Sequence, residues 1–412
     1  MRFGTSLSRV GQYNENAVIH ALRALGPSSQ GDLVAQTGLS VPTVSAIVRS
    51  LKQNGYLMEL GTEPIARGRP RVILDLVPSA SYAVGLHIDP AIMSVVVLDL
   101  RGQVVHAGSS ESVRPDDALR TLDEAATLVD KVVTESGIDR DRLLGACAAV
   151  PGPIDSAKGS ITDPVWMPGW AGVSIGTHLA HRLGSPGTPL PVIKDTLAAV
   201  IGENWVRGGD SLESTMLFVY LGTGTGVGLS LNGEPVRGSS DNAGEIGRML
   251  LALGESPNRG MDNDPFVLVE QAHAKGVLSG ALPSRSEPRL LENHFRRLCS
   301  LAMEGNEAAG RMLRAAGERV AEMLVMVAEV FDADTVVFGG PYWELLQPFY
   351  AEAAVAAFER PSARGPHPVA VLPTAMGAKV GAIGAASAVL DARFVPRAPS
   401  RQSTQSTLSV QM

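Results

Sequence analysis

The chain has 412 residues, more than one typical domain, so we expect two or three domains. Its hydrophobic content of 45% with 19% charged residues is typical of a globular protein with apolar cores. No apolar run approaches the roughly 20 residues of a membrane helix, and the N-terminus lacks an apolar signal core. These features argue against a membrane protein and predict a cytoplasmic one. Two cysteines, Cys147 and Cys299, form no metal-type spacing, so we expect buried free thiols.

The net charge of −7 is unevenly distributed along the chain. Residues 1–80 hold eight Lys/Arg against five Asp/Glu, a net charge of +3, so the remainder carries −10. This asymmetry predicts a small nucleic-acid-binding region attached to an acidic body.

The first residues predict three helices. Apolar positions in Asn16–Leu25 follow helical spacing, and Gly26-Pro27 ends that segment. Ser29 with Asp32 fits a capping box that starts a second helix, which runs through Thr37. Ser40 is the expected N-cap of a third helix, which ends at Gly55. The short turn between the second and third helices predicts a helix-turn-helix; an ordinary helical hairpin in a larger domain is the competing interpretation.

The third helix has one apolar stripe, and the residues away from that stripe are candidates for DNA contact. They are Pro42, Thr43, Ser45, Ala46 and Arg49. Small and hydroxyl-bearing side chains allow a helix to enter the major groove, while an arginine reaches a phosphate or a guanine edge.

Two strands, Tyr56–Leu60 and Arg71–Leu76, are expected to follow as a β-hairpin wing. The loop between them carries Arg67 and Arg69 on either side of a glycine, a pattern suited to the narrow minor groove of A·T-rich DNA. Solvated charge on a hairpin tip is the alternative. We expect a two-fold symmetric, A·T-flanked site bound by a homodimer or homotetramer.

A change of composition near residue 78 predicts a domain boundary. We assign residues 1–80 to the DNA-binding domain, 81–392 to a second domain and 393–412 to a disordered tail rich in Ser, Thr, Gln and Pro. The expected elements of the second domain are strands at 83–88, 93–100, 103–107, 143–150 and 335–338, and helices at 115–135, 307–331 and 377–390.

One stretch, Leu221–Arg248, contains four alternate glycines followed by Asn-Ala-Gly-Glu-Ile-Gly. Glycines tolerate φ > 0 and lack a Cβ, so such a run can bring backbone N–H groups to an anionic ligand. The stretch resembles the second phosphate loop and the sugar-contacting segment of the ROK family (repressors, open reading frames, kinases). Residues 38–57 and 67–76 resemble the winged helix of ROK repressors. The resemblance, over residues 10–390, implies a winged helix-turn-helix followed by a two-lobed, actin/hexokinase-like α/β domain.

The chain departs from the kinases of that family in two places. Their first phosphate loop, D-x-G-x-T, reads His87 to Ala91 here, and Pro90 removes a backbone donor. The family's zinc-binding cysteines are absent from the segment after Arg248, so we expect no metal, no cofactor and no catalytic activity.

The resemblance also implies the ligand-binding residues. Asp195 matches the kinase general base, Lys194 replaces an asparagine ligand, and Arg248 replaces a histidine. The full implied set is Lys194, Asp195, Asn242, Glu245, Arg248 and Glu270. Lys194 and Arg248 either pair with the neighbouring carboxylates or bind an anionic sugar, and we favour the anionic ligand. Trp166, where the family has an asparagine, either stacks on a sugar or packs into the cleft.

These observations predict a DNA-binding transcriptional regulator of carbohydrate-related genes whose non-catalytic body senses a sugar or an anionic sugar derivative. A regulator with an occluded pocket that responds to a protein partner is the alternative, and a sugar kinase is the less favoured one.

Overall fold

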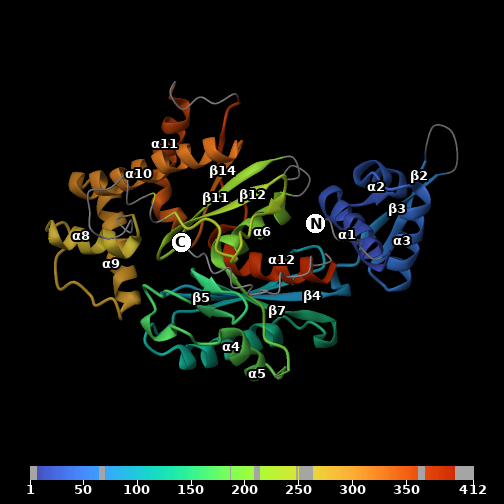
Figure 1. Cartoon of the computed structure of the whole chain (residues 1–412), viewed down its shortest axis with the longest axis horizontal. Coiled ribbons are helices and arrows are strands. Elements are labelled where there is room, and N and C mark those ends of the chain that lie inside the picture. The colour runs from blue at the N-terminus through green and yellow to red at the C-terminus, as the bar shows by residue number, and fades with distance from the viewer. Residues whose placement is uncertain are drawn as a thin grey trace, which may run out of the picture.

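The computed structural model describes residues 7–64, 70–185, 187–207, 214–246, 249, 263–360 and 367–394. A small N-terminal unit, called the head, lies at one end of a larger two-lobed body (Figure 1). The predicted tail lies outside the described residues except for its first two positions, which close the last helix, α12 (Val380–Phe394).

The head is a winged helix-turn-helix, as the sequence predicts. Its elements are α1 (Leu7–Leu25), β1 (Ser28–Ser29), α2 (Gln30–Thr37), α3 (Val41–Gln53), β2 (Leu57–Glu63) and β3 (Arg71–Leu76). The strands form an antiparallel sheet in the order β1-β3-β2. α1 starts nine residues before the predicted Asn16, since a helix can extend through residues such as the exposed Tyr13 without burying them.

Local capping chemistry sets the helix boundaries of the head. The Ser29 and Asp32 side chains each accept a hydrogen bond from the other residue's backbone N–H, which confirms the capping box at the start of α2. Gly38 ends α2 with φ at +66°, and the Ser40 hydroxyl accepts from the Thr43 N–H at the start of α3.

The body contains two lobes with the same sheet topology. Lobe 1 comprises β4 (Tyr82–Ile88), β5 (Met93–Asp99), β6 (Val104–Ser110), α4 (Ala118–Glu135), β7 (Leu143–Val150), β8 (Ile154–Asp155), β9 (Ser160–Ile161), α5 (Ile175–Arg182) and β10 (Val192–Lys194). Lobe 2 comprises β11 (Thr215–Leu221), β12 (Thr225–Leu231), β13 (Glu234–Pro235), α8 (Pro265–Ala274), α9 (Pro288–Met303), α10 (Glu307–Phe331), β14 (Thr335–Gly339), α11 (Trp343–Glu359) and β15 (Ala370–Pro373).

The sheet orders are β6-β5-β4-β7-β10 and β13-β12-β11-β14-β15, each with two antiparallel pairings followed by two parallel ones. This repeated topology confirms the two-lobed α/β fold.

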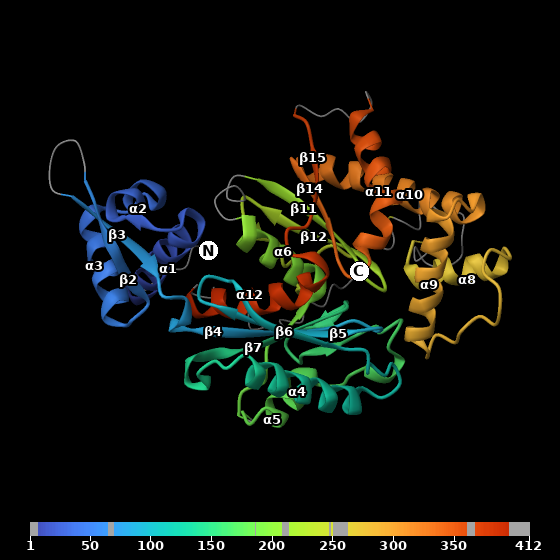
Figure 2. The same cartoon turned by 180° about the vertical axis from the view of Figure 1, so that it is seen from behind.

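Two helices lie between the lobes, as Figure 2 shows from behind. α6 (Asp195–Arg207) packs against β11 and β12, while α12 packs against β4, β5 and β7 and along α6. The approach of α6 and α12 is close because both carry a glycine at the crossing: a Cβ on Gly202 would lie 3.0 Å from Gly384 Cα.

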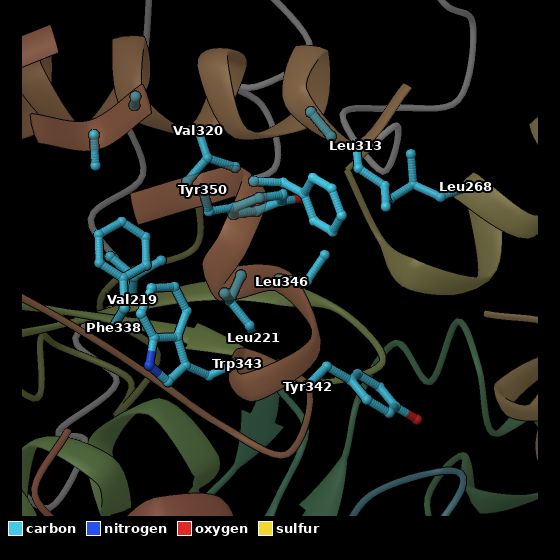
Figure 3. Packing of buried hydrophobic residues seen from close by; sticks show 14 of the residues in the cluster. Val219, Leu221, Leu268, Leu313, Val320, Phe338, Tyr342, Trp343, Leu346 and Tyr350 are labelled. Carbon is cyan, nitrogen blue, oxygen red and sulfur yellow. The ribbon is translucent and has the colours of Figure 1, made fainter. Parts of the chain in front are cut away.

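The core of lobe 2 is rich in aromatic side chains (Figure 3). Phe338 of β14 and Trp343 of α11 stack with their ring centroids 5.0 Å apart. The side chains of Cys147 and Cys299 are both buried, as predicted. No helix within the described residues has the length and hydropathy needed to cross a membrane.

Candidate functional site

The outer face of α3 is the candidate DNA-binding surface. Val44, Val48 and Leu51 are buried, and the side chains of Pro42, Ala46 and Arg49 are exposed on the other side of the helix. The predicted stripe is therefore the core face, and these three candidates are accessible.

The two hydroxyl-bearing candidates on α3 already have partners within the head. The Ser45 hydroxyl donates to Gln30 Oε1 (2.8 Å), and Thr43 Oγ1 lies 2.8 Å from the Ser40 hydroxyl. Sequence reasoning had no signal for the contact with Gln30, which lies 15 residues away. The strands of the wing are confirmed, whereas the predicted contacts Arg67 and Arg69 lie outside the described residues.

Lys194 forms an ion pair that joins the two lobes. It ends β10 in lobe 1, and its Nζ lies 2.6 Å from Glu245 Oε1 on the lobe 2 side. The Lys194 side chain is only 3% exposed, whereas the Glu245 side chain is 51% exposed. Nζ also donates to the Ala243 carbonyl at 3.3 Å. The sequence left two roles open for Lys194 and Arg248, pairing with a carboxylate or binding an anionic sugar. For Lys194, the structure has the carboxylate pair.

Asp195 starts α6 beside this ion pair. Burial raises the pKa of its carboxyl to about 7, although the Lys194 charge and the Thr196 N–H both favour the ionised form. The negative charges of Asp89 and Glu245 raise the pKa further. A carboxyl with this pKa is present in both its protonated and its ionised form near neutral pH.

The side-chain amide of Asn242 makes contacts with the backbone. Its Oδ1 accepts from the Ile154 N–H, and its Nδ2 donates to the carbonyls of Ile154 and Ser240, at 2.7 Å, 2.7 Å and 2.8 Å respectively. Asn242 thus joins β8 of lobe 1 to the turn that carries Glu245. This contact assigns it a positioning role in the described residues.

Glu270 and Trp166 belong to a second group of contacts. Glu270 on α8 forms a bidentate pair with Arg285, with N–O distances of 2.6 and 2.8 Å. The Arg285 guanidinium lies over the Trp166 ring, 4.9 Å from its centroid, and that ring meets Phe266 edge-on at 5.4 Å. Trp166 is 8% exposed, so in this structure it packs into the body. Nothing in the sequence pointed to Arg285. Arg248, the sixth predicted ligand residue, lies outside the described residues.

None of the four alternate glycines adopts a left-handed conformation, and three of them, Gly222, Gly226 and Gly228, serve close packing. Of the two properties of glycine, the missing Cβ is the one that these positions use. They have no Cβ, which allows α6 to approach: a Cβ on Gly226 would lie 2.6 Å from Thr196 Cγ2, and one on Gly228 would meet Val200. A true positive φ occurs later, at Gly244 (+86°), where a Cβ would overlap the Val227 carbonyl.

The chain's own Asp89 binds the glycine-rich loop. Its carboxylate accepts from the Thr223 hydroxyl (2.7 Å), the Thr223 N–H (3.1 Å) and the Ala91 N–H (3.1 Å). Burial raises the pKa of Asp89, and these hydrogen bonds oppose that effect. The Thr223 N–H and hydroxyl both donate to the buried Asp89 carboxylate, so neither is left to bind a nucleotide phosphate. These residues therefore do not fit a nucleotide bound in this loop.

His87, at the first position of the altered loop, has a packing role. Its Nε2 lies 2.9 Å from the Tyr220 hydroxyl, which links β4 of lobe 1 to β11 of lobe 2. Burial lowers the pKa of His87 to about 4, so the ring is neutral at physiological pH.

A joint between head and body was not foreseen from the sequence. We use this name for Arg23 and His20 of α1, Trp205 of α6, Asp391 of α12 and the Leu100 carbonyl. The Arg23 guanidinium carbon lies 3.4 Å from the Trp205 ring centroid, and its Nε donates to the Leu100 carbonyl at 3.0 Å. Trp205 Nε1 donates to Asp391 Oδ1 at 2.6 Å.

The joint contains a charge that is incompletely hydrogen-bonded. Both Nη atoms of Arg23 are buried without a hydrogen-bond partner among the described residues. Burial lowers the pKa of Arg23 to about 9, even though Asp391 and Asp99 raise it. Burial also raises the pKa of Asp391 to about 6, against the effect of Arg23. An arrangement of this kind is costly to bury, and exposing Arg23 to water would recover hydration.

The described residues contain no group of three or more His, Cys, Asp or Glu side chains that could hold a metal ion. Two histidines, His273 of α8 and His294 of α9, lie close together. Their Nε2 and Nδ1 atoms are 2.8 Å apart and form an ordinary hydrogen bond.

Comparison with known proteins gives the family. The family model described as "ROK family" matches residues 85–392. The xylose repressor of Bacillus subtilis (strain 168) is 25% identical over 244 residues, which are 59% of this chain and 61% of the repressor. A crystal structure of a ROK family transcriptional regulator, a homolog of the E. coli MLC protein, covers 94% of this chain and 97% of its own, with a TM-score of 0.67 and 19% identity. A ROK family glucokinase from Streptomyces griseus, solved with glucose and AMPPNP, covers 75% and 99%, with a TM-score of 0.59 and 19% identity. The chain belongs to the ROK family.

Proposed function

We propose that this protein is a DNA-binding transcriptional regulator whose ROK body senses a carbohydrate or an anionic carbohydrate derivative without catalysing a reaction on it. The observation that carries the proposal is the joint, which connects a winged helix-turn-helix to α6, the helix that begins at the cleft with Asp195. Regulators and a xylose repressor among the relatives support the same function.

The glycine-rich loop supports regulation over catalysis. A sugar kinase must hold the phosphates of its nucleotide, and here Asp89 accepts from both donors of Thr223. The kinase alternative retains one supporting feature, because Asp195 with a pKa of about 7 has the proton affinity of a general base. A coupled ADP-release assay with common hexoses tests this alternative, and turnover that Asp195→Asn abolishes would establish it.

The cleft would bind its effector through a small number of polar groups. Lys194 is neutralised by Glu245, so Arg248 is the cation that we propose for an anionic sugar, as a bidentate partner of its phosphate or carboxylate. Asp195 and the second carboxylate oxygen of Glu245 would meet the sugar hydroxyls, and Glu270 would do so only through lone pairs that the Arg285 pair leaves available. The competing proposal is an occluded cleft that responds to a protein partner, supported by the packing of Trp166.

α6 would carry the signal from the cleft to the head. Residues Asp195 to Glu203 are all buried, so the helix shifts as a unit when its first turn moves. Its last turn holds Trp205, on which Arg23 of the head lies. A shift that releases Arg23 to water would change the orientation of the head, and in a dimer it would change the spacing of the two recognition helices.

The required energy is within reach of such a ligand. A shift from mostly bound to mostly free DNA needs an effector that prefers one state by about 5 kcal/mol. Two or three hydrogen bonds to charged groups, at about 1.5–3 kcal/mol each, supply that preference if they form in one state alone.

The test measures effector binding and DNA binding separately. Thermal-shift titration with sugars, sugar phosphates and sugar acids identifies the ligand, and operator titration measures its effect. We expect a phosphorylated or acidic sugar to change operator affinity at least tenfold and its neutral parent to do so far less. Arg248→Ala should remove the response and keep DNA binding.

Trp205→Leu separates coupling from binding. It should preserve the thermal shift caused by the ligand and reduce the change in operator affinity, while Val206→Ala, at the exposed neighbouring position, should behave as wild type. A ligand response that survives Trp205→Leu unchanged would refute the path through α6. An equal response to the neutral sugar would refute the role of charge, and no response to any sugar would favour the occluded cleft.

A further inference from the structure

The first turn of α3 presents apolar side chains to solvent. Val41, the first residue after the Ser40 cap, is 62% exposed, although valine is a residue that folding usually buries. Pro42 and, one turn later, Ala46 are exposed beside it. Pro42 and Ala46 are among the DNA contacts predicted from the sequence, whereas Val41 is not.

The polar groups on the same part of α3 are largely committed to the head itself. The Ser45 hydroxyl has one proton, and it donates that proton to Gln30 Oε1, which cannot donate in return. Thr43 is tied to the Ser40 cap through both its hydroxyl and its backbone N–H. Among the side chains from Val41 to Arg49, the donor without a hydrogen bond to the described part of the head is the exposed Arg49, about two turns beyond Val41.

This arrangement limits which base edges the turn can recognise. In a helix-turn-helix, the N-terminal residues of the second helix meet the base edges in the major groove. Three of the four bases present only hydrogen-bonding groups there, whereas thymine also presents its C5-methyl group. Apolar side chains without donors or acceptors complement that methyl group and leave the polar edges of the other bases unpaired.

We propose that Val41, together with Pro42 and Ala46, selects thymine by contact with its methyl group in the major groove. This inference rests on the proposed DNA-binding function. A DNA occupant is favoured over an apolar protein partner because Arg49 lies on the same exposed side of α3 and the head region carries a net charge of +3. The cap at Ser40 fixes the direction of the first turn, so Val41 is held for this contact before DNA arrives.

The test uses the full-length protein and DNA duplexes with and without thymine methyl groups. A binding site is first selected from a randomised duplex library, and each thymine of the half-site is then replaced in turn by deoxyuridine. This change removes the methyl group and leaves the hydrogen-bonding groups of both grooves in place. Loss of one buried methyl contact should weaken binding about fourfold, equivalent to about 0.8 kcal/mol.

A double-mutant cycle assigns the effect to Val41. The wild type should prefer thymine over deoxyuridine about fourfold at the position that Val41 contacts. In Val41→Ala, the ratio at that position should fall to near one, and the ratios at the other positions should not change. Val104→Ala, an exposed valine on β6 of the body, should retain every preference. Val41 is exposed, so the variant should keep the melting temperature of the wild type.

Each other outcome has a distinct meaning. Equal binding of thymine and deoxyuridine sites by the wild type would overturn the methyl contact and leave DNA binding intact. A thymine preference that Val41→Ala does not change would overturn the role of this side chain. Failure to enrich any sequence, with no salt-dependent binding to duplex DNA, would overturn the proposed function together with this inference.

Discussion

Replacing Asp195 by asparagine should stabilise the body at neutral and alkaline pH. The carboxyl is 8% exposed, and its pKa in the folded protein is about 7 compared with 3.8 in the unfolded chain. Burial is the main cause, so the folded protein favours the protonated form. Asparagine has nearly the same shape, cannot ionise, and keeps an oxygen that accepts from the Thr196 N–H.

The sign and size of the effect follow from proton linkage. Because the folded pKa is raised, the contribution of Asp195 to stability is greatest below pH 4 and is lost as the pH rises from about 4 to about 7. A difference of about three pKa units sets a ceiling of about 4 kcal/mol, and relaxation of the surrounding groups should reduce it to about 2 kcal/mol. The stabilising effect of Asp195→Asn should therefore be absent near pH 4 and complete at pH 8.

Thermal and denaturant unfolding between pH 4 and pH 8 test this prediction. We expect the variant to melt a few degrees above the wild type at pH 8. Asp334→Asn is the control of opposite sign, because hydrogen bonds from Ser214, Thr335 and Thr215 overcome the effect of burial and lower the Asp334 pKa. That variant should be less stable than the wild type at neutral pH, with the deficit shrinking in acid. An Asp195→Asn variant that is less stable at pH 8, or whose difference from the wild type does not change with pH, would refute the reasoning.

Two further predictions concern the wing and the cleft. The double change Arg67→Ala/Arg69→Ala should weaken binding and relax the preference for A·T-rich flanks in footprinting, because both arginines are predicted to enter the minor groove; full affinity in the double variant would show that the wing assignment is wrong. Glu245→Ala should lower stability by about 1–3 kcal/mol, since among the described residues it leaves the buried Lys194 ammonium with the Ala243 carbonyl as its acceptor, and adding Lys194→Met should restore the melting temperature. If Glu245→Ala melts like the wild type, the ion pair does not contribute to stability.

The head shows how far local sequence determines structure. The capping box at Ser29, the left-handed Gly38 and the cap at Ser40 were all predictable, because each depends on residues within a few positions in the chain. The periodic burial of α3 follows from the same short-range geometry. For the predicted contacts Arg67, Arg69 and Arg248, which lie outside the described residues, the sequence is still the basis of the assignment.

The roles of the cleft residues were decided by tertiary structure. The resemblance assigned Lys194 and Glu245 to one ligand site, but whether their side chains pair depends on how the two lobes meet. Asn242 contacts Ile154, 88 residues away, and this contact turns an expected ligand into a positioning residue.

The contacts of the glycine-rich loop and of the joint could not be predicted from the sequence. Spacing predicted a glycine-rich turn, but only the folded chain shows that Asp89, 134 residues from Thr223, accepts its hydrogen bonds. The Trp205 side chain likewise meets Asp391 from 186 positions away. Caps and periodicity are set by neighbours along the chain, so the sequence by itself determined the helices and wing strands of the head, several elements of the body and the family. Partners of buried charges are set by which surfaces pack together, so only the tertiary structure decided which anion the loop holds and how the head is attached to the body.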